Sequence, residues 1–283
     1  MAERNPAFVT ADWLEERLGQ PGLSIVDGAW YLPAQGRDAR AEYDAGHIPG
    51  AVFFDHDKTV EPGSTLPHHL PSPESFARFA GAMGIAETDT IVVYDGFGLF
   101  SAPRTRWLFR VMGADKVVIL EGGLDGWKRE GRPVTAEPTR IAPNVFNATF
   151  REDWVASLDD MRRIVEDGSA QIADARPAGR FEGVDPEPRQ GLRGGHMPGA
   201  RNVPFPGFSR DGRMVGKEEL KQFLDDAGID VGRPVVTSCG SGVSAAIISL
   251  ALETIGHADN RLYDGSWAEW GSLPDTPVVK GKP

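Results

Sequence analysis

The chain reads Pro234-Val235-Val236-Thr237-Ser238-Cys239-Gly240-Ser241-Gly242-Val243-Ser244 near its carboxyl end. The apolar run that opens this segment predicts a short buried strand over residues 234–238. A helix is expected to begin with Ser244 as its N-cap and to end before Gly256. A strand, a loop and a helix in direct succession are typical of the carboxyl edge of a parallel sheet, where α/β folds bind ligands. The loop that contains Cys239 is therefore the first candidate for a functional site.

The same pattern occurs once before in the chain, which indicates an internal repeat. Gly46-His47-Ile48-Pro49-Gly50-Ala51 recurs as Gly195-His196-Met197-Pro198-Gly199-Ala200, and matched landmarks stay 143 to 149 residues apart. Each half has a strand ending in aspartate, a second buried strand, a helix that stops at glycine, a third strand and a glycine-rich turn with tryptophan. These features lie at 24–27, 91–94, 101–112, 117–120 and 121–127 in the first half, and at 171–174, 234–238, 244–255, 260–263 and 264–270 in the second.

Strands that alternate with helices predict an α/β protein with two tandem domains, each a mainly parallel sheet flanked by helices. We expect the first domain over residues 1–135 and the second over 151–283. The proline-containing, weakly periodic stretch 136–150 is expected to be the linker. The tryptophans of the glycine-rich turns are expected to pack in the core or between domains: Trp127, Trp267 and Trp270.

The composition indicates a globular protein without a nucleic-acid or membrane partner. The net charge of -11 disfavours binding to nucleic acid or to an anionic membrane, and no apolar run approaches the length of a transmembrane helix. Residues 1–10 contain no basic region followed by an apolar core. We therefore expect no secretory signal and a cytoplasmic location.

The cysteine count limits the chemistry of the chain. Cys239 is the only cysteine, which excludes an intramolecular disulfide and a zinc site built on several thiolates. The adjacent pair His68-His69 has no metal-ligand spacing, and we interpret it as a solvated loop feature. We expect neither a metal nor an organic cofactor.

The loop after the 234–238 strand favours an anion at its first residue. Gly240 and Gly242 allow the backbone to curl with its N–H groups inward, and the following helix adds the positive end of its dipole. Both effects should lower the pKa of the Cys239 thiol and stabilise a thiolate or a persulfide. The competing interpretation is that Cys239 is a small buried hydrophobic residue, as single cysteines commonly are.

Two further positions narrow the chemistry. Cysteine phosphatases hold phosphate with an arginine six residues after the cysteine, and Ala245 stands at that position here. Phosphate-ester hydrolysis is therefore disfavoured. In the first half, Asp95 takes the place of the cysteine. Because a carboxylate cannot accept and pass on sulfur, we expect the first domain to be catalytically silent.

These residues resemble the rhodanese family, and within it the group that uses 3-mercaptopyruvate as sulfur donor. The resemblance runs from Trp30-Tyr31-Leu32-Pro33 to Asp264-Gly265-Ser266-Trp267 and rests most on the Cys-Gly-Ser-Gly-Val loop. It implies that Arg180 and Arg189 bind the carboxylate and ketone oxygen of the donor, a task suited to planar guanidinium groups. Ser244 departs from the threonine expected at that position and keeps the hydroxyl.

The resemblance also implies the remaining site residues. Ser241 is expected to be catalytic, and the loop residues Gly240, Gly242, Val243 and Ser244 are expected to line the donor site. A histidine and an aspartate from the first domain are implied as partners of the serine, and the matching candidates are His47 and Asp38. His47 has a counterpart in His196, so a structural role in the shared turn is the simpler alternative.

The implied reaction has two halves. The Cys239 thiolate takes sulfur from 3-mercaptopyruvate as a persulfide and releases pyruvate, and a thiol, a thioredoxin-like protein or cyanide then accepts the sulfur. A thiosulfate:cyanide sulfurtransferase is the nearest alternative. A non-catalytic sulfur-binding or redox-sensing module is the second, and it would not need the arginine pair.

Overall fold

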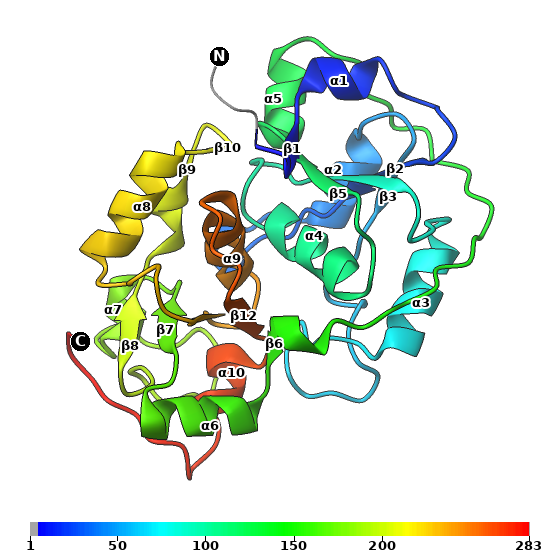
Figure 1. Cartoon of the computed structure of the whole chain (residues 1–283). Helices are drawn as coiled ribbons and strands as arrows, with labels where there is room; N and C mark the ends of the chain where they lie inside the picture. Colours follow the sequence, from blue (N-terminus) through cyan, green and yellow to red (C-terminus); the bar gives the residue numbers. More distant parts are fainter. Residues whose placement is uncertain (1–4, 283) are drawn as a thin grey trace. The chain divides into compact units, whose positions relative to one another are not determined.

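The strands of the computed structural model, which describes residues 5–282, form two five-stranded sheets, one in each half (Figure 1). All neighbouring strands within these two sheets are parallel. The strand orders are β1-β5-β4-β2-β3 and β6-β12-β11-β7-β8, so the two sheets have the same topology. The prediction of tandem α/β domains with parallel sheets is confirmed.

The first sheet is built from short apolar runs that are buried on both faces, as parallel strands are. Its strands are β1 (Phe8–Val9), β2 (Leu23–Asp27), β3 (Ala51–Phe53), β4 (Thr90–Tyr94) and β5 (Val117–Leu120). A core cluster joins one face to helices α1 (Ala11–Glu15), α2 (Ala39–Ala45) and α5 (Gly123–Arg129). Helices α3 (Pro73–Ala82) and α4 (Ala102–Val111) cover the other face (Figure 1), and aromatic contacts join them through Phe76 and Phe109.

The second sheet repeats this arrangement. Its strands are β6 (Val155–Ala156), β7 (Gln171–Asp174), β8 (Ala200–Asn202), β11 (Val235–Ser238) and β12 (Asn260–Tyr263). One face packs on helices α6 (Leu158–Asp167), α7 (Ala178–Phe181) and α10 (Ser266–Trp270). Helix α9 (Ala245–Thr254) contacts β7, β11 and β12, and α8 (Lys217–Asp226) follows the hairpin of β9 (Ser209–Arg210) and β10 (Arg213–Met214).

The residues group into two compact units, and each unit includes one short segment from the other half of the sequence. The first contains residues up to Gly63, Leu70–Arg151 and Asp211–Arg213; the second contains Ser64–His69, Glu152–Arg210 and Met214 onward. Residues 136–150, expected as a linker, group with the first unit. The segment Ser64–His69 groups with the second, although β3 and α3 on either side of it belong to the first.

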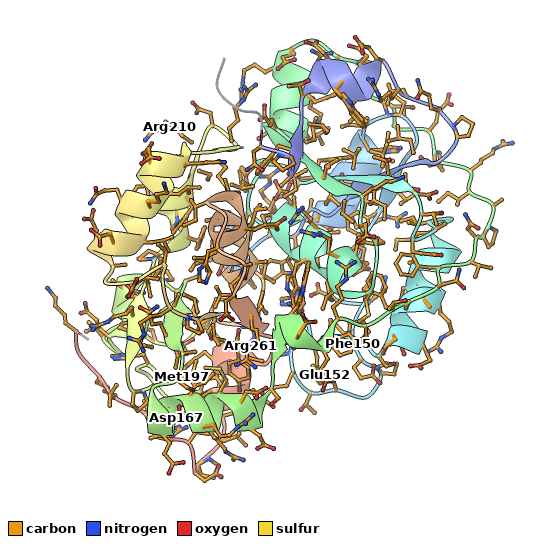
Figure 2. All side chains as sticks on the ribbon, viewed as in Figure 1. Phe150, Glu152, Asp167, Met197, Arg210 and Arg261 are labelled. Carbon is orange, nitrogen blue, oxygen red and sulfur yellow. The ribbon has the colours of Figure 1, made fainter. Side chains whose placement is uncertain are left out.

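The tryptophans of the glycine-rich turns lie in the cores. Trp127, Trp267 and Trp270 have no exposed surface, and each belongs to the core cluster of its own half. Met197 is also part of the second core, whereas Asp167 at the end of α6 is exposed; both are labelled in Figure 2. Across residues 5–282, no helix is long and apolar enough to cross a membrane.

One sequence prediction about the helices was wrong. Ser101 and Ser244 precede α4 and α9 as expected, but neither side chain makes a capping hydrogen bond. Both residues have right-handed helical dihedral angles, whereas a side-chain N-cap needs an extended backbone. The Ser101 hydroxyl instead accepts a hydrogen bond from the Trp30 N–H at 3.0 Å. The glycine stops are confirmed, since Gly113 and Gly256 follow the helices with positive φ.

Candidate active site

Cys239 is buried, with 2% of its surface exposed, at the carboxyl end of β11. Its N–H donates to the Ser266 hydroxyl at 3.2 Å, and its carbonyl accepts from the Trp267 N–H at 2.9 Å. The next carbonyl, of Gly240, accepts from the Ala268 N–H at 2.9 Å. The loop is therefore anchored to the first turn of α10, which holds the cysteine in one place.

The glycines of the loop serve different needs. Gly242 has a φ of 79°, a left-handed conformation that favours glycine. Gly240 leaves room for an arginine, because a Cβ atom at this position would lie 3.1 Å from Nη2 of Arg180. The guanidinium of Arg180 thus lies against the residue that follows Cys239.

A buried carboxylate holds Arg180 in this place. Oε2 of Glu187 accepts from Nη2 of Arg180 at 2.5 Å and from Nε at 3.2 Å, and Oε1 accepts from Nη1 of Arg176 at 2.8 Å. Arg176 also donates to Asp174 at 2.7 Å and stacks on the ring of Trp267, 4.2 Å from its centroid. The side chains of Asp174, Arg176 and Glu187 are almost completely buried.

The ionic state of this network follows from its charges. Burial by itself lowers the pKa of Arg176, but the adjacent carboxylates of Asp174 and Glu187 outweigh burial and raise it above its ordinary value. Arg176 therefore stays charged in the core.

Ser241 has a histidine partner from the first half of the sequence. Its hydroxyl lies 3.0 Å from Nδ1 of His68, which is 173 residues away in the sequence. Both side chains are buried, and His68 has a φ of 56°, an unusual backbone conformation for a residue other than glycine. The interpretation of His68 as a solvated loop residue was wrong, because its segment packs with the second unit.

His47 and Asp38 make contacts that shape the first half. Nδ1 of His47 lies 2.8 Å from the carbonyl of Tyr43, and its ring stacks on that tyrosine at 4.0 Å. His196 makes the same two kinds of contact with Phe181 in the second half. The Asp38 carboxylate accepts from the Ala41 N–H and caps α2. These contacts favour the structural alternative for His47, and a role of Asp38 in catalysis stays a prediction.

The remaining predicted residues are Val243, Ser244 and Arg189. Val243 is buried and Ser244 half-buried at the start of α9. Arg189 is half-buried two residues after Glu187. Its contact with a donor stays a prediction. Within residues 5–282, no group of three or more His, Cys, Asp or Glu side chains is arranged to hold a metal ion.

The equivalent loop of the first half is held by the same kind of backbone hydrogen bond, but it begins with Asp95 in place of a cysteine. The Asp95 carbonyl accepts from the Leu124 N–H at 2.9 Å, as the Cys239 carbonyl does from Trp267. The Asp95 carboxylate accepts from four backbone N–H groups: those of Gly98, Phe100, Ser101 and Ala102. A carboxylate of the chain itself thus occupies this loop in the first half, and the absence of catalysis there stays a prediction.

Sequence reasoning missed three residues of this site, namely Arg176, Glu187 and His68. A comparison of the two repeats contained a signal for the first, because Asp174-Ala175-Arg176 corresponds to Asp27-Gly28-Ala29. Arg176 has no charged counterpart in the first repeat, and this difference could have indicated that the candidate site lies in the second half. No local signal pointed to His68.

Comparisons with known proteins agree with this geometry. A family model described as a rhodanese-like domain matches residues 10–130 and 157–273. The chain is 43% identical to the 3-mercaptopyruvate sulfurtransferase of Escherichia coli over 96% of its own length and 97% of the relative's. It is 40% identical to the thiosulfate sulfurtransferase of Cricetulus griseus, covering 98% and 96%.

The fold is shared with a solved structure of the same kind. The crystal structure of a 3-mercaptopyruvate sulfotransferase from Escherichia coli superposes with a TM-score of 0.86 and 41% sequence identity. The match covers 92% of this chain and 98% of that one.

Proposed function

The chain belongs to the rhodanese family, and we propose that it is a sulfurtransferase that takes sulfur from 3-mercaptopyruvate onto Cys239 and passes it to an external acceptor. The observation that carries this proposal is the guanidinium of Arg180 held against Gly240, next to the only cysteine. A cation at this position can bind a carboxylate two carbons from a sulfur atom and present that sulfur to the thiolate.

The donor is bound through its α-keto acid group. Arg180 has Nε and one Nη2 proton on Glu187, which leaves Nη1 and the second Nη2 proton for the donor carboxylate. Arg189, in the loop that follows α7, binds the ketone oxygen or the second carboxylate oxygen. Gly240, Gly242, Val243 and Ser244 line the pocket with backbone N–H groups, which suit an anionic donor and a persulfide.

Sulfur transfer balances without a cofactor. The Cys239 thiolate attacks the donor sulfur, an S–S bond forms and the C–S bond breaks. The electron pair of the broken bond goes to the three-carbon fragment, which leaves as the enolate of pyruvate. The proton lost from the donor thiol ends on the enolate carbon, so that one persulfide and one pyruvate result.

The pair of Ser241 and His68 is suited to move this proton. A hydroxyl and an imidazole nitrogen 3.0 Å apart form a relay in which the histidine accepts the proton and the serine presents it. Burial of both side chains keeps the relay from exchanging protons freely with solvent.

The acceptor half-reaction needs a second molecule. Since the 283-residue chain has no other cysteine, no internal thiol can resolve the persulfide. A small thiol, a thioredoxin-like dithiol or cyanide attacks the outer sulfur and regenerates the Cys239 thiolate. We keep the cytoplasm as the expected compartment, where such thiols are abundant.

Thiosulfate is the second candidate donor, favoured by the similarity to a thiosulfate sulfurtransferase. The test is steady-state sulfur transfer to cyanide with each donor, for the native chain and for Cys239→Ser. We expect a large preference for 3-mercaptopyruvate that disappears in the variant. A preference for thiosulfate contradicts the donor, and transfer from neither contradicts the sulfurtransferase.

A further inference from the structure

The charges around Arg180 are balanced within the protein. Its partner Glu187 contacts both Arg180 and Arg176, and Arg176 is already paired with Asp174. Two guanidinium groups and two carboxylates give this network a formal charge of zero. Glu187 thus joins the buried pair of Arg176 and Asp174 to Arg180, whose guanidinium lies against Gly240 of the cysteine loop.

The exposed fraction of the side chain separates Arg180 from the other three members of the network. The side chains of Asp174, Arg176 and Glu187 are 0%, 1% and 1% exposed, whereas that of Arg180 is 19% exposed. A carboxylate this deeply buried and held by two arginines has a fixed position. It fixes the plane of the Arg180 guanidinium in turn, because Oε2 of Glu187 accepts from two nitrogens on one edge of that plane.

We propose that Glu187 is a positioning residue that determines donor specificity: it orients Arg180 for a planar carboxylate and reduces the positive charge available to the donor. This inference rests on the proposed function. 3-Mercaptopyruvate carries one carboxylate charge and binds by matching the free edge of a guanidinium. Thiosulfate is a compact dianion without a planar carboxylate, so it depends more on the net charge of the pocket than on the orientation of one arginine.

The first variant is Glu187→Gln, which removes the charge and keeps the size of the side chain. We expect kcat/KM for 3-mercaptopyruvate to fall about tenfold, mainly through KM, the lower end for losing a hydrogen bond between charged groups. With thiosulfate, kcat/KM should rise, so the ratio of the two donors shifts by more than this. Arg176 keeps its contacts with Asp174 and the Gly195 carbonyl, so the core stays paired.

Glu187→Asp separates charge from position. The shorter side chain keeps the negative charge but cannot span both arginines, so we expect a higher KM for 3-mercaptopyruvate with no gain for thiosulfate. Glu42→Gln is the matched control, since Glu42 pairs with Arg37 in the silent half through Nε at 2.8 Å and Nη2 at 2.5 Å. It should leave both donors unchanged.

The outcomes are distinct. If Glu187→Gln lowers the thermal midpoint while the donor ratio stays as in the native chain, Glu187 has only a structural role and the inference fails. A parallel fall with both donors also overturns it. If the native chain transfers sulfur from neither donor, the proposed function itself fails, which the native control shows before any variant is compared.

Discussion

Side chains from distant parts of the chain lie around the loop that contains Cys239. Cys239 and Ser241 lie in one loop, Arg180 comes from α7, and His68 comes from a segment that precedes α3 in the sequence. The contact of His68 with Ser241 joins the segment Ser64–His69 to the loop that contains Cys239. Because the two side chains are in contact, substitutions of His68 and Ser241 should not have independent effects.

We expect Ser241→Ala and His68→Ala each to lower kcat for pyruvate release by about a hundredfold, as is typical for loss of proton transfer. Because both act in one relay, the double variant should be little slower than either single variant. Rapid-quench measurement of pyruvate checks this. His69→Asn is the control, because its ring contacts Ser64 and not Ser241. Losses that add in full would show that the two residues act separately.

Individual residues also show where sequence reasoning reaches its limit. Cys239 was predicted from its own surroundings, a glycine-rich loop between a strand and a helix, whereas Arg180 was predicted only from the family resemblance. His68 was misread, since a contact across 173 residues leaves no local pattern. Glu187 was missed because a carboxylate in a loop looks solvated until its two arginine partners are placed beside it.

At the scale of elements, both halves use the same strand, loop and helix for different purposes. Loop 239–244 is held by α10 and begins with Cys239, whereas loop 95–101 is held by α5 and its N–H groups donate to the Asp95 carboxylate. These elements were predictable to within about two residues, because each strand is a short apolar run and each helix stops at a glycine. The prediction that Ser101 and Ser244 cap their helices was wrong because capping depends on backbone dihedral angles, which the residue type does not determine.

The Asp95 carboxylate is expected to stabilise the first half. Asp95→Asn replaces a carboxylate that accepts four backbone hydrogen bonds by a neutral amide. We therefore expect the free energy of unfolding to fall by about 1–3 kcal/mol. Urea denaturation measures this loss, with Asp125→Asn, an exposed position in α5, as the control. Sulfur transfer at low temperature should be unchanged. Equal stability of native and D95N protein would mean that the loop does not need an anion.

At the scale of the whole molecule, the repeat is symmetric in backbone and asymmetric in charge. Asp27 and Asp174 end equivalent strands, but Arg176 accompanies only the second, and Ala29 stands at the matching place in the first. Burial without that cation is the main cause that raises the pKa of Asp27 to about 7, and the nearby carboxylates of Asp95 and Glu42 add to it. Hydrogen bonds from Ala29 and Tyr94 oppose the rise.

This asymmetry predicts how stability depends on pH. An unfolded aspartate titrates near a pKa of about 3.9, so the folded protein holds the Asp27 proton more tightly than the unfolded chain does. Its contribution to stability is complete below that value and is lost as the pH rises to about 7. Asp27→Asn should remove this dependence, so that its free energy of unfolding falls less than the native one between pH 4 and about 7 in urea titrations. Parallel pH profiles for the two proteins would contradict the assignment.

The most direct measurement of the central claim is the mass of Cys239 after one equivalent of 3-mercaptopyruvate is added in the absence of an acceptor. We predict that the native chain gains the mass of one sulfur atom at Cys239, releases pyruvate in equal amount and returns to its original mass when cyanide is added. Cys239→Ser should gain nothing. Pyruvate release by the native chain without a sulfur adduct on Cys239 would contradict the persulfide mechanism.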